Sequence, residues 1–197
     1  MSSPIHVRSA RADDIDLVVD ILADAFKDDP VLLWISSHAD FPVFNFKAVI
    51  QAFIDDRGIL VDDSGSAAAL FLPPGKTMSS VITAGVALKG LWTFGPGALL
   101  KAVKLLDLFE QHHYQGDHIY IFAIGNRATA RQQGFGSAVM KHLLSLAGAD
   151  RYPVYLENSK PANAQFYAKF GFEPVVEIAL PRGGPPVTSM LRKAPTV

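Results

Sequence analysis

The chain has 197 residues, which is enough for one domain with a well-developed core and few for two. Its 18 lysines and arginines nearly balance 19 aspartates and glutamates. The sequence has no run of basic residues that would indicate a nucleic-acid partner. It has no cysteine, which excludes disulfides, thiolate zinc sites and a cysteine nucleophile. We therefore expect a single domain over residues 1–197, and a cytoplasmic one because the N-terminus lacks an apolar signal region.

The first third of the chain predicts a strand, three helices and a hairpin. Apolar residues recur at helical spacing between Ile15 and Phe26, and Asp13 or Asp14 is placed to cap that helix. The turn sequence Asp-Asp-Ser-Gly at 62–65 joins two apolar runs, as in a hairpin. The expected strands are 5–8, 58–61 and 67–72, and the expected helices are 14–26, 31–37 and 44–54.

The apolar stretch from Val81 to Leu106 predicts a helical hairpin, with helices at 79–89 and 97–111. Lys89, Pro96 and Lys101 interrupt it well short of the ~20 apolar residues that a membrane span needs. We therefore expect no membrane segment, and a buried or cleft-covering hairpin instead.

The last part of the chain alternates strands and helices. The expected strands are 118–125, 154–157, 175–180 and 187–191, and the expected helices are 137–149 and 162–170. Alternation of this kind implies crossover connections and a largely parallel centre to the sheet. The fold class expected is α/β (mixed α+β), with one central sheet of about six to seven strands flanked by helices.

A glycine-containing loop lies between the strand at 118–125 and the helix at 137–149, and residues 131–136 read Arg-Gln-Gln-Gly-Phe-Gly. A strand that turns into a helix through glycines leaves backbone N–H groups pointing at one spot, which favours pyrophosphate binding. The glycines could instead merely allow close helix packing. A dinucleotide fingerprint would need glycine at Val139, and a P-loop would need glycine at Leu70, so neither pattern fits.

Asn163 and Tyr167 lie four residues apart in the next expected helix, so they share one face and can both address a ligand. They could equally be a polar residue of the first turn and a packing ring. A phenol of pKa ~10 stays protonated near neutral pH until a leaving group develops charge, which suits a proton donor.

The Arg-x-x-Gly-x-Gly loop resembles the acyl-CoA loop of the GNAT superfamily of N-acetyltransferases, and Asn163-Ala-Gln-Phe-Tyr167 followed by Gly171-Phe172 is similar to that family's next signature. The resemblance implies a cofactor core at about 118–172 and a cofactor cleft between two splayed central strands. It also implies acceptor-side helical elements at about 13–56 and 78–111. The implied activity is direct transfer of an acetyl group from acetyl-CoA to a primary amine of a small molecule or peptide, with coenzyme A as product.

The resemblance also assigns roles to particular residues. Tyr167 would protonate the departing thiolate, and a backbone N–H near Ile124 or Gly125 would polarise the thioester carbonyl. The implied cofactor contacts are Ile124, Gly125, Asn126, Arg131, Gln132, Gln133, Gly134, Phe135, Gly136, Ser137 and Asn163. Members usually have Val-x-Pro where this chain has Asn-Arg-Ala at 126–128, and often glycine at the position of Gln132. These departures favour the alternative of a non-catalytic acyl-CoA-binding or regulatory module.

The general base is left open by the sequence. Glu157, at the end of the strand that follows the cofactor helix, is the first candidate, although it could also pair with a cation or cap a turn. His118 and Tyr120 share one strand face and are the next candidates. His112 and His113 end a helix, and no matching ligand set accompanies them, so we expect no metal.

The sequence also does not decide which residues form the acceptor site. Trp34, Trp92 and Phe94 are candidates for its wall. An acidic rim of Asp24, Asp28 and Asp29 could attract a cationic amine, or could consist of solvated charges at a helix end. The sequence also leaves three alternatives undecided: transfer of a different acyl chain, transfer to an oxygen acceptor, and assembly as a homodimer.

Overall fold

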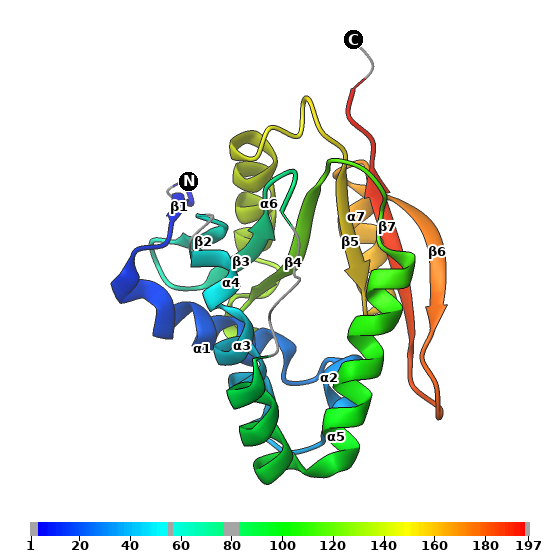
Figure 1. Cartoon of the computed structure of the whole chain (residues 1–197). Helices are drawn as coiled ribbons and strands as arrows, with labels where there is room; N and C mark the ends of the chain where they lie inside the picture. The colour runs from blue at the N-terminus through cyan, green and yellow to red at the C-terminus, as the bar shows by residue number, and fades with distance from the viewer. Residues whose placement is uncertain (1–3, 55–56, 77–82, 196–197) are drawn as a thin grey trace.

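Strand-forming runs of apolar residues assemble one mixed sheet in the computed structural model, which describes residues 4–54, 57–76 and 83–195. The described strands are β1 (Val7–Ser9), β2 (Ile59–Asp62), β3 (Ala67–Leu72), β4 (Ile119–Asn126), β5 (Val154–Asn158), β6 (Glu173–Ala179) and β7 (Pro186–Arg192). These seven strands lie in the order β1-β2-β3-β4-β5-β7-β6. The expectation of a mixed sheet of about six to seven strands flanked by helices is confirmed (Figure 1).

Helices cover both faces of the sheet, because the strands bury side chains alternately on each side. The described helices are η1 (Ala12–Asp14), α1 (Ile15–Phe26), α2 (Pro30–Ile35), α3 (Phe41–Val49), α4 (Gln51–Ile54), α5 (Ala84–His112), η2 (Ala128–Ala130), α6 (Phe135–Leu146), η3 (Pro161–Asn163) and α7 (Ala164–Ala168). Helices α1 to α5 share a core with Tyr120 and Tyr155, whereas α6 and α7 share another with Ile121 and Leu156. The first of these faces is called the α1 face below, and the second the α6 face.

The parallel part of the sheet is narrower than expected. Among the described strands only β4 and β5 pair in parallel, and the other neighbours are antiparallel. The reason is that β6 and β7 form a hairpin, and β7 returns between β5 and β6. The alternation of strands and helices therefore ends at β6.

Several element boundaries differ from the sequence expectation. The first strand covers 7–9 rather than 5–8, and Asp14 does not cap α1 with its side chain. Asp14 instead accepts a hydrogen bond of 2.7 Å from the Arg11 N–H and pairs with Arg8. The helical hairpin is α5, whose two arms meet at a kink where Gly95 has φ 82° and Pro96 follows. Residues 79–82 of the expected first arm lie outside the described residues.

A bulge in β4 lies next to the point where β4 and β5 diverge. Leu70 pairs with Ala123 and Phe71 with Ile121, so Phe122 is an extra residue opposite β3. As a result Phe122 and Ala123 both pack on the α1 face. On its other side β4 pairs with β5 only as far as Ile121 and Leu156, beyond which the two strands diverge.

Candidate active site

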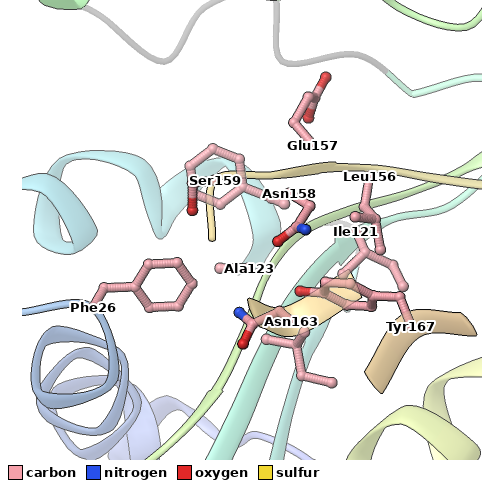
Figure 2. A pocket seen from close by; sticks show the side chains of 11 residues that line it. Phe26, Ile121, Ala123, Leu156, Glu157, Asn158, Ser159, Asn163 and Tyr167 are labelled. Atoms are coloured by element: carbon pink, nitrogen blue, oxygen red, sulfur yellow. The ribbon is translucent and has the colours of Figure 1, made fainter. Parts of the chain in front are cut away.

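A cleft opens where β4 and β5 separate. Its lining comes from both strands, from Phe26 at the end of α1, from Asn163 in η3 and from Tyr167 in α7 (Figure 2). The expected cleft between two splayed central strands is therefore present. On the side facing β5, the edge of β4 from Phe122 to Asn126 pairs with no strand in the described part of the chain. Its backbone groups there are available to a ligand.

The glycine-containing loop leads from the end of β4 into α6. Gly134 precedes the helix in the left-handed region, with φ 89°, and the helix has no side-chain cap. The first-turn N–H groups of Phe135, Gly136 and Ser137 have no partner within the helix and point beyond its N-terminus. The Gln133 amide holds the loop by donating to the Thr129 carbonyl at 2.9 Å.

Gln132 also lies in the left-handed region, with φ 63°. This is the position at which the resemblance implies glycine, so the loop keeps the glycine-type conformation despite a side chain that disfavours it. The departure at Gln132 therefore adds backbone strain to this loop.

Glycines allow close contacts on both sides of the site. A Cβ atom at Gly125 would lie 2.6 Å from the Cβ of Ala25, because α1 packs directly on β4 there. A Cβ atom at Gly136 would lie 3.3 Å from Asn126 Oδ1 and 3.8 Å from the Phe166 ring. The start of α6 therefore sits against the end of β4 and against α7.

The three acidic residues expected at the rim are engaged with neighbouring segments. Asp24 accepts a 2.8 Å hydrogen bond from the Ala128 N–H, which lies just before the loop. Asp28 pairs with Lys160 at 2.5 Å and with Arg131 at 3.7 Å. Asp29 is buried, caps α2 through the N–H groups of Val31 and Leu32, and accepts a hydrogen bond from Ser159. These carboxylates tie elements together, which argues against an acidic rim for the amine.

Tyr167 and Asn163 reach the cleft from the α6 face. Tyr167 is buried in the same core as Leu156, and its ring packs edge-on against Phe166 and Phe172. Burial, and then the Asp29 carboxylate, raise the pKa of the Tyr167 phenol well above its usual value. The phenol is thus held protonated, as a proton donor must be. Asn163 is exposed and lines the same cleft.

Glu157 lies on the opposite face. Strand alternation puts it on the side of Tyr155, and in Figure 2 its side chain points away from Asn163 and Tyr167. The side chain is only 4% exposed, with Oε1 3.6 Å from His113 Nδ1. Burial, followed by the Glu157 charge, raises the pKa of Tyr120 and of Tyr155. Glu157 is therefore a buried carboxylate that lines the cleft, and not a surface ion-pair partner.

His113, at the end of α5, is the neighbour that sequence reasoning missed. Its Nε2 lies 3.0 Å from Nε2 of His118, and its ring packs at 4.9 Å from both Tyr120 and Tyr155. No local signal could have found this contact, because it depends on where a long hairpin returns to the sheet. Among the described residues no group of three or more His, Cys, Asp or Glu is arranged to hold a metal ion.

The aromatic residues proposed for an acceptor wall lie elsewhere. Trp92 is 83% exposed on α5, and Phe94 packs against Phe41 and Phe44. Trp34 lies under Lys101, whose Nζ donates to the Trp34 carbonyl and sits 5.4 Å from the ring. None of the three lines the cleft between β4 and β5.

The geometry agrees with comparisons to known proteins. The family described as acetyltransferase (GNAT) domain matches residues 101–174, which span β4, the loop, α6, β5 and α7. Residues 101–174 of this chain are therefore similar to a GNAT acetyltransferase domain, and the solved structures below share the fold of the chain. This similarity supports the assignment of the chain as an acetyltransferase.

In the described ranges no helix is both long enough and apolar enough to cross a membrane.

Solved structures share the fold over nearly the whole chain. A histone acetyltransferase HPA2 and related acetyltransferase from Corynebacterium glutamicum has 24% identity, covers 99% of both chains and gives a TM-score of 0.71. Arylalkylamine N-acetyltransferase 2 from Aedes aegypti has 14% identity, a TM-score of 0.66, and covers 98% of this chain and 100% of that one. Drosophila melanogaster polyamine N-acetyltransferase has 13% identity, a TM-score of 0.63, and covers 96% and 100%.

Proposed function

We propose that this protein transfers an acetyl group from acetyl-CoA to a primary amine of a small molecule or peptide, by direct transfer in a ternary complex. The main support is a single cleft between β4 and β5 that has a buried carboxylate, Glu157, toward one face of the sheet and a buried phenol, Tyr167, toward the other. Two substrates can meet there from opposite faces, which brings their reacting atoms together without an acyl-enzyme.

The residues present fit acetyl-CoA. The uncapped N–H groups at the start of α6 would hold its pyrophosphate, aided by the helix dipole. The unpaired edge of β4 from Ile124 to Asn126 would pair with the pantetheine arm, and Asn163 would contact it from the α7 side. When bound, acetyl-CoA supplies the thioester carbon that the amine attacks and the thiolate that departs.

The remaining steps are assigned to the chain's own groups. Glu157 accepts a proton from the protonated amine, which frees the nitrogen lone pair for attack. A backbone N–H near Ile124 or Gly125 polarises the thioester carbonyl. Tyr167 then donates its proton to the departing sulfur, because its raised pKa keeps it protonated until that sulfur develops charge.

One test measures coenzyme A release from acetyl-CoA with a panel of amines. The panel follows the names of the solved structures reported above: polyamines, arylalkylamines, and a lysine-containing histone peptide. We expect turnover with at least one class, and loss of most of that turnover in Tyr167→Phe.

A second candidate function, a non-catalytic acyl-CoA-binding module, is favoured by the strained Gln132. Acetyl-CoA binding without turnover on any amine would support that module and reject the enzyme. Thermal unfolding with acetyl-CoA, NAD and ATP tests the cofactor separately. We expect acetyl-CoA alone to raise Tm markedly, because only a ligand that binds the folded state stabilises it by mass action. Equal stabilisation by NAD would reject the cofactor assignment.

A further inference from the structure

A row of three side chains extends from the cleft to the loop before β4. Glu157 Oε1 lies 3.6 Å from His113 Nδ1, and His113 Nε2 lies 3.0 Å from His118 Nε2. At its far end, His118 Nδ1 lies 2.7 Å from the Gly116 carbonyl oxygen. We call Glu157, His113 and His118 the buried row.

The Gly116 carbonyl fixes the proton positions along the buried row. A carbonyl oxygen only accepts, so His118 Nδ1 must carry the hydrogen and donate it. Burial lowers the pKa of His118, which keeps this imidazole neutral and leaves its Nε2 as a bare acceptor. His113 Nε2 must therefore donate to His118 Nε2. A neutral His113 then presents a bare Nδ1 to Glu157.

In this arrangement the two facing atoms of Glu157 and His113 can share one proton. Glu157 Oε1 is buried and has no hydrogen-bond partner within the described residues. An ionised carboxylate oxygen facing a bare ring nitrogen is unfavourable, because two lone pairs meet and the carboxylate oxygen is buried. A single proton between the two atoms satisfies both of them.

We propose that Glu157 and His113 act as one proton-accepting pair, in which His113 is a positioning residue that takes the proton from Glu157 and releases it to water. In this step a bond between the amine nitrogen and hydrogen breaks, its electron pair stays on nitrogen, and the proton binds the Glu157 carboxylate. It then passes to His113 Nδ1 and leaves to solvent. The source of the proton rests on the proposed function, whereas the pairing of the two side chains does not.

The exposure of the two side chains and the residues around them agree with proton transfer from Glu157 to His113. The His113 side chain is 25% exposed and that of Glu157 only 4%, so His113 is the member that reaches water. Tyr120 from β4 and Tyr155 from β5 pack against the His113 ring, and their raised pKa keeps both phenols neutral.

On the far side of the row, Tyr114 packs against His118 at 5.4 Å, and Asp117 precedes His118 in the chain. His118 cannot carry the proton further, because its Nδ1 hydrogen ends on a carbonyl. Its part in the pair is to fix the tautomer of His113.

The first experiment needs no substrate. Long-range ¹H–¹⁵N NMR of ¹⁵N-histidine in the apo protein reports which ring nitrogen carries hydrogen. We expect the Nδ1–H form for His118 and the Nε2–H form for neutral His113, assigned through His113→Asn and His118→Asn spectra. Neutral His113 with hydrogen on Nδ1, or His118 with hydrogen on Nε2, would overturn the proposal whether or not the protein is an enzyme.

The second experiment measures kcat/KM for the best amine as a function of pH. His113→Ala is expected to lose about tenfold or more, to show an altered pH profile, and to regain activity with added imidazole. His113→Asn, which keeps a polar group but carries no proton, should behave like His113→Ala.

His112→Ala is the matched control, since the exposed His112 ring bonds to the Leu108 carbonyl of its own helix and, among the described residues, to no group of the buried row. It should match the wild type in rate and in pH profile. A folded His113→Ala variant with an unchanged profile and no response to imidazole would refute the pair. Absence of turnover in the wild type would reject the proposed function and leave the NMR result to decide the pairing.

Discussion

At the scale of single residues, a variant of Tyr167 can distinguish a role in proton donation from a role in packing. Tyr167→Phe keeps the ring between Phe166 and Phe172 and removes only the phenolic proton donor. We expect folding and coenzyme A affinity to change little, and kcat to fall about 10²-fold, the lower end of the range for a lost general acid, because water supplies part of the proton. Steady-state coenzyme A release and a binding titration of the same variant measure the two effects. An unchanged kcat would make Tyr167 a packing residue.

Gly136 tests the phosphate position. Gly136→Glu places a carboxylate among the uncapped N–H groups of α6, and like-charge repulsion should abolish coenzyme A binding. Gly136→Ala is the control, because the nearest atoms to its Cβ are the Asn126 amide oxygen at 3.3 Å and the edge of the Phe166 ring at 3.8 Å. It should keep most of the affinity in calorimetry. If a folded Gly136→Glu variant binds as well as the wild type, the pyrophosphate binds somewhere else.

Gln132 stores strain that glycine would remove. A left-handed non-glycine residue costs about 1–2 kcal/mol, and glycine loses about 0.5–1 kcal/mol more than other residues through chain entropy. Gln132→Gly should therefore raise the free energy of unfolding by up to about 1.5 kcal/mol, as measured in urea. Gln133→Gly is the neighbouring control. It lacks a positive φ and loses the hydrogen bond to Thr129, so it should destabilise.

At the scale of elements, the contact between α1 and β4 depends on one glycine. A Cβ at Gly125 would lie 2.6 Å from that of Ala25, so Gly125→Ala should destabilise the fold by about 1–3 kcal/mol through overpacking. Adding Ala25→Gly removes the opposing atom and should recover part of the loss. Urea unfolding of the two single variants and the double variant measures the coupling, and strict additivity would show that α1 moves away freely.

Local sequence signals predicted the elements well where the signal and the structure are both local. The strand at 67–72 is β3 residue for residue, and the turn before it forms because Asp62 accepts hydrogen bonds from Ser64 and Ser66. The loop at 131–136 leads into a helix, as its glycines indicate.

Long-range features could not be predicted in this way. The contact of His113 with Glu157 joins the end of α5 to β5, and the bulge at Phe122 depends on the register with β3. The sequence offered only an acidic rim or solvated helix-end charges for Asp28 and Asp29, because their partners, Lys160 and Ser159, lie about 130 residues away. Such contacts follow from tertiary packing, which spacing along the chain does not encode.

At the scale of the whole molecule, one ion pair near β1 should govern part of the acid stability. Arg8 makes two hydrogen bonds to Asp14, at 2.6 and 3.0 Å, and lowers the pKa of that carboxyl to about 2. A depressed pKa stabilises the fold fully above the unfolded value near 4, and the stabilisation is lost as the pH falls through about 2. The Asp14 side chain is 14% exposed, and the shift corresponds to about 2 kcal/mol.

The measurement is the difference in unfolding free energy between the wild type and Asp14→Asn, followed from about pH 6 to pH 2. We expect it to shrink by about 2 kcal/mol over this range. Asp63→Asn removes the other carboxylate of Arg8, which is 53% exposed, and should give a much smaller change. A constant difference for Asp14→Asn would mean that its carboxyl titrates alike in the folded and unfolded chains.

The corner where α1 ends and α2 begins holds three separate segments at once. Asp24 binds the chain before the loop at 131–136, Asp28 reaches Arg131 and Lys160, and Asp29 binds Ser159. Segments that share one anchor open together, so their amides should exchange with deuterium as one cooperative unit. Asp29→Ala should therefore speed exchange in the loop around Arg131 as well as around Ser159. Acceleration confined to α2 would show that the segments open independently.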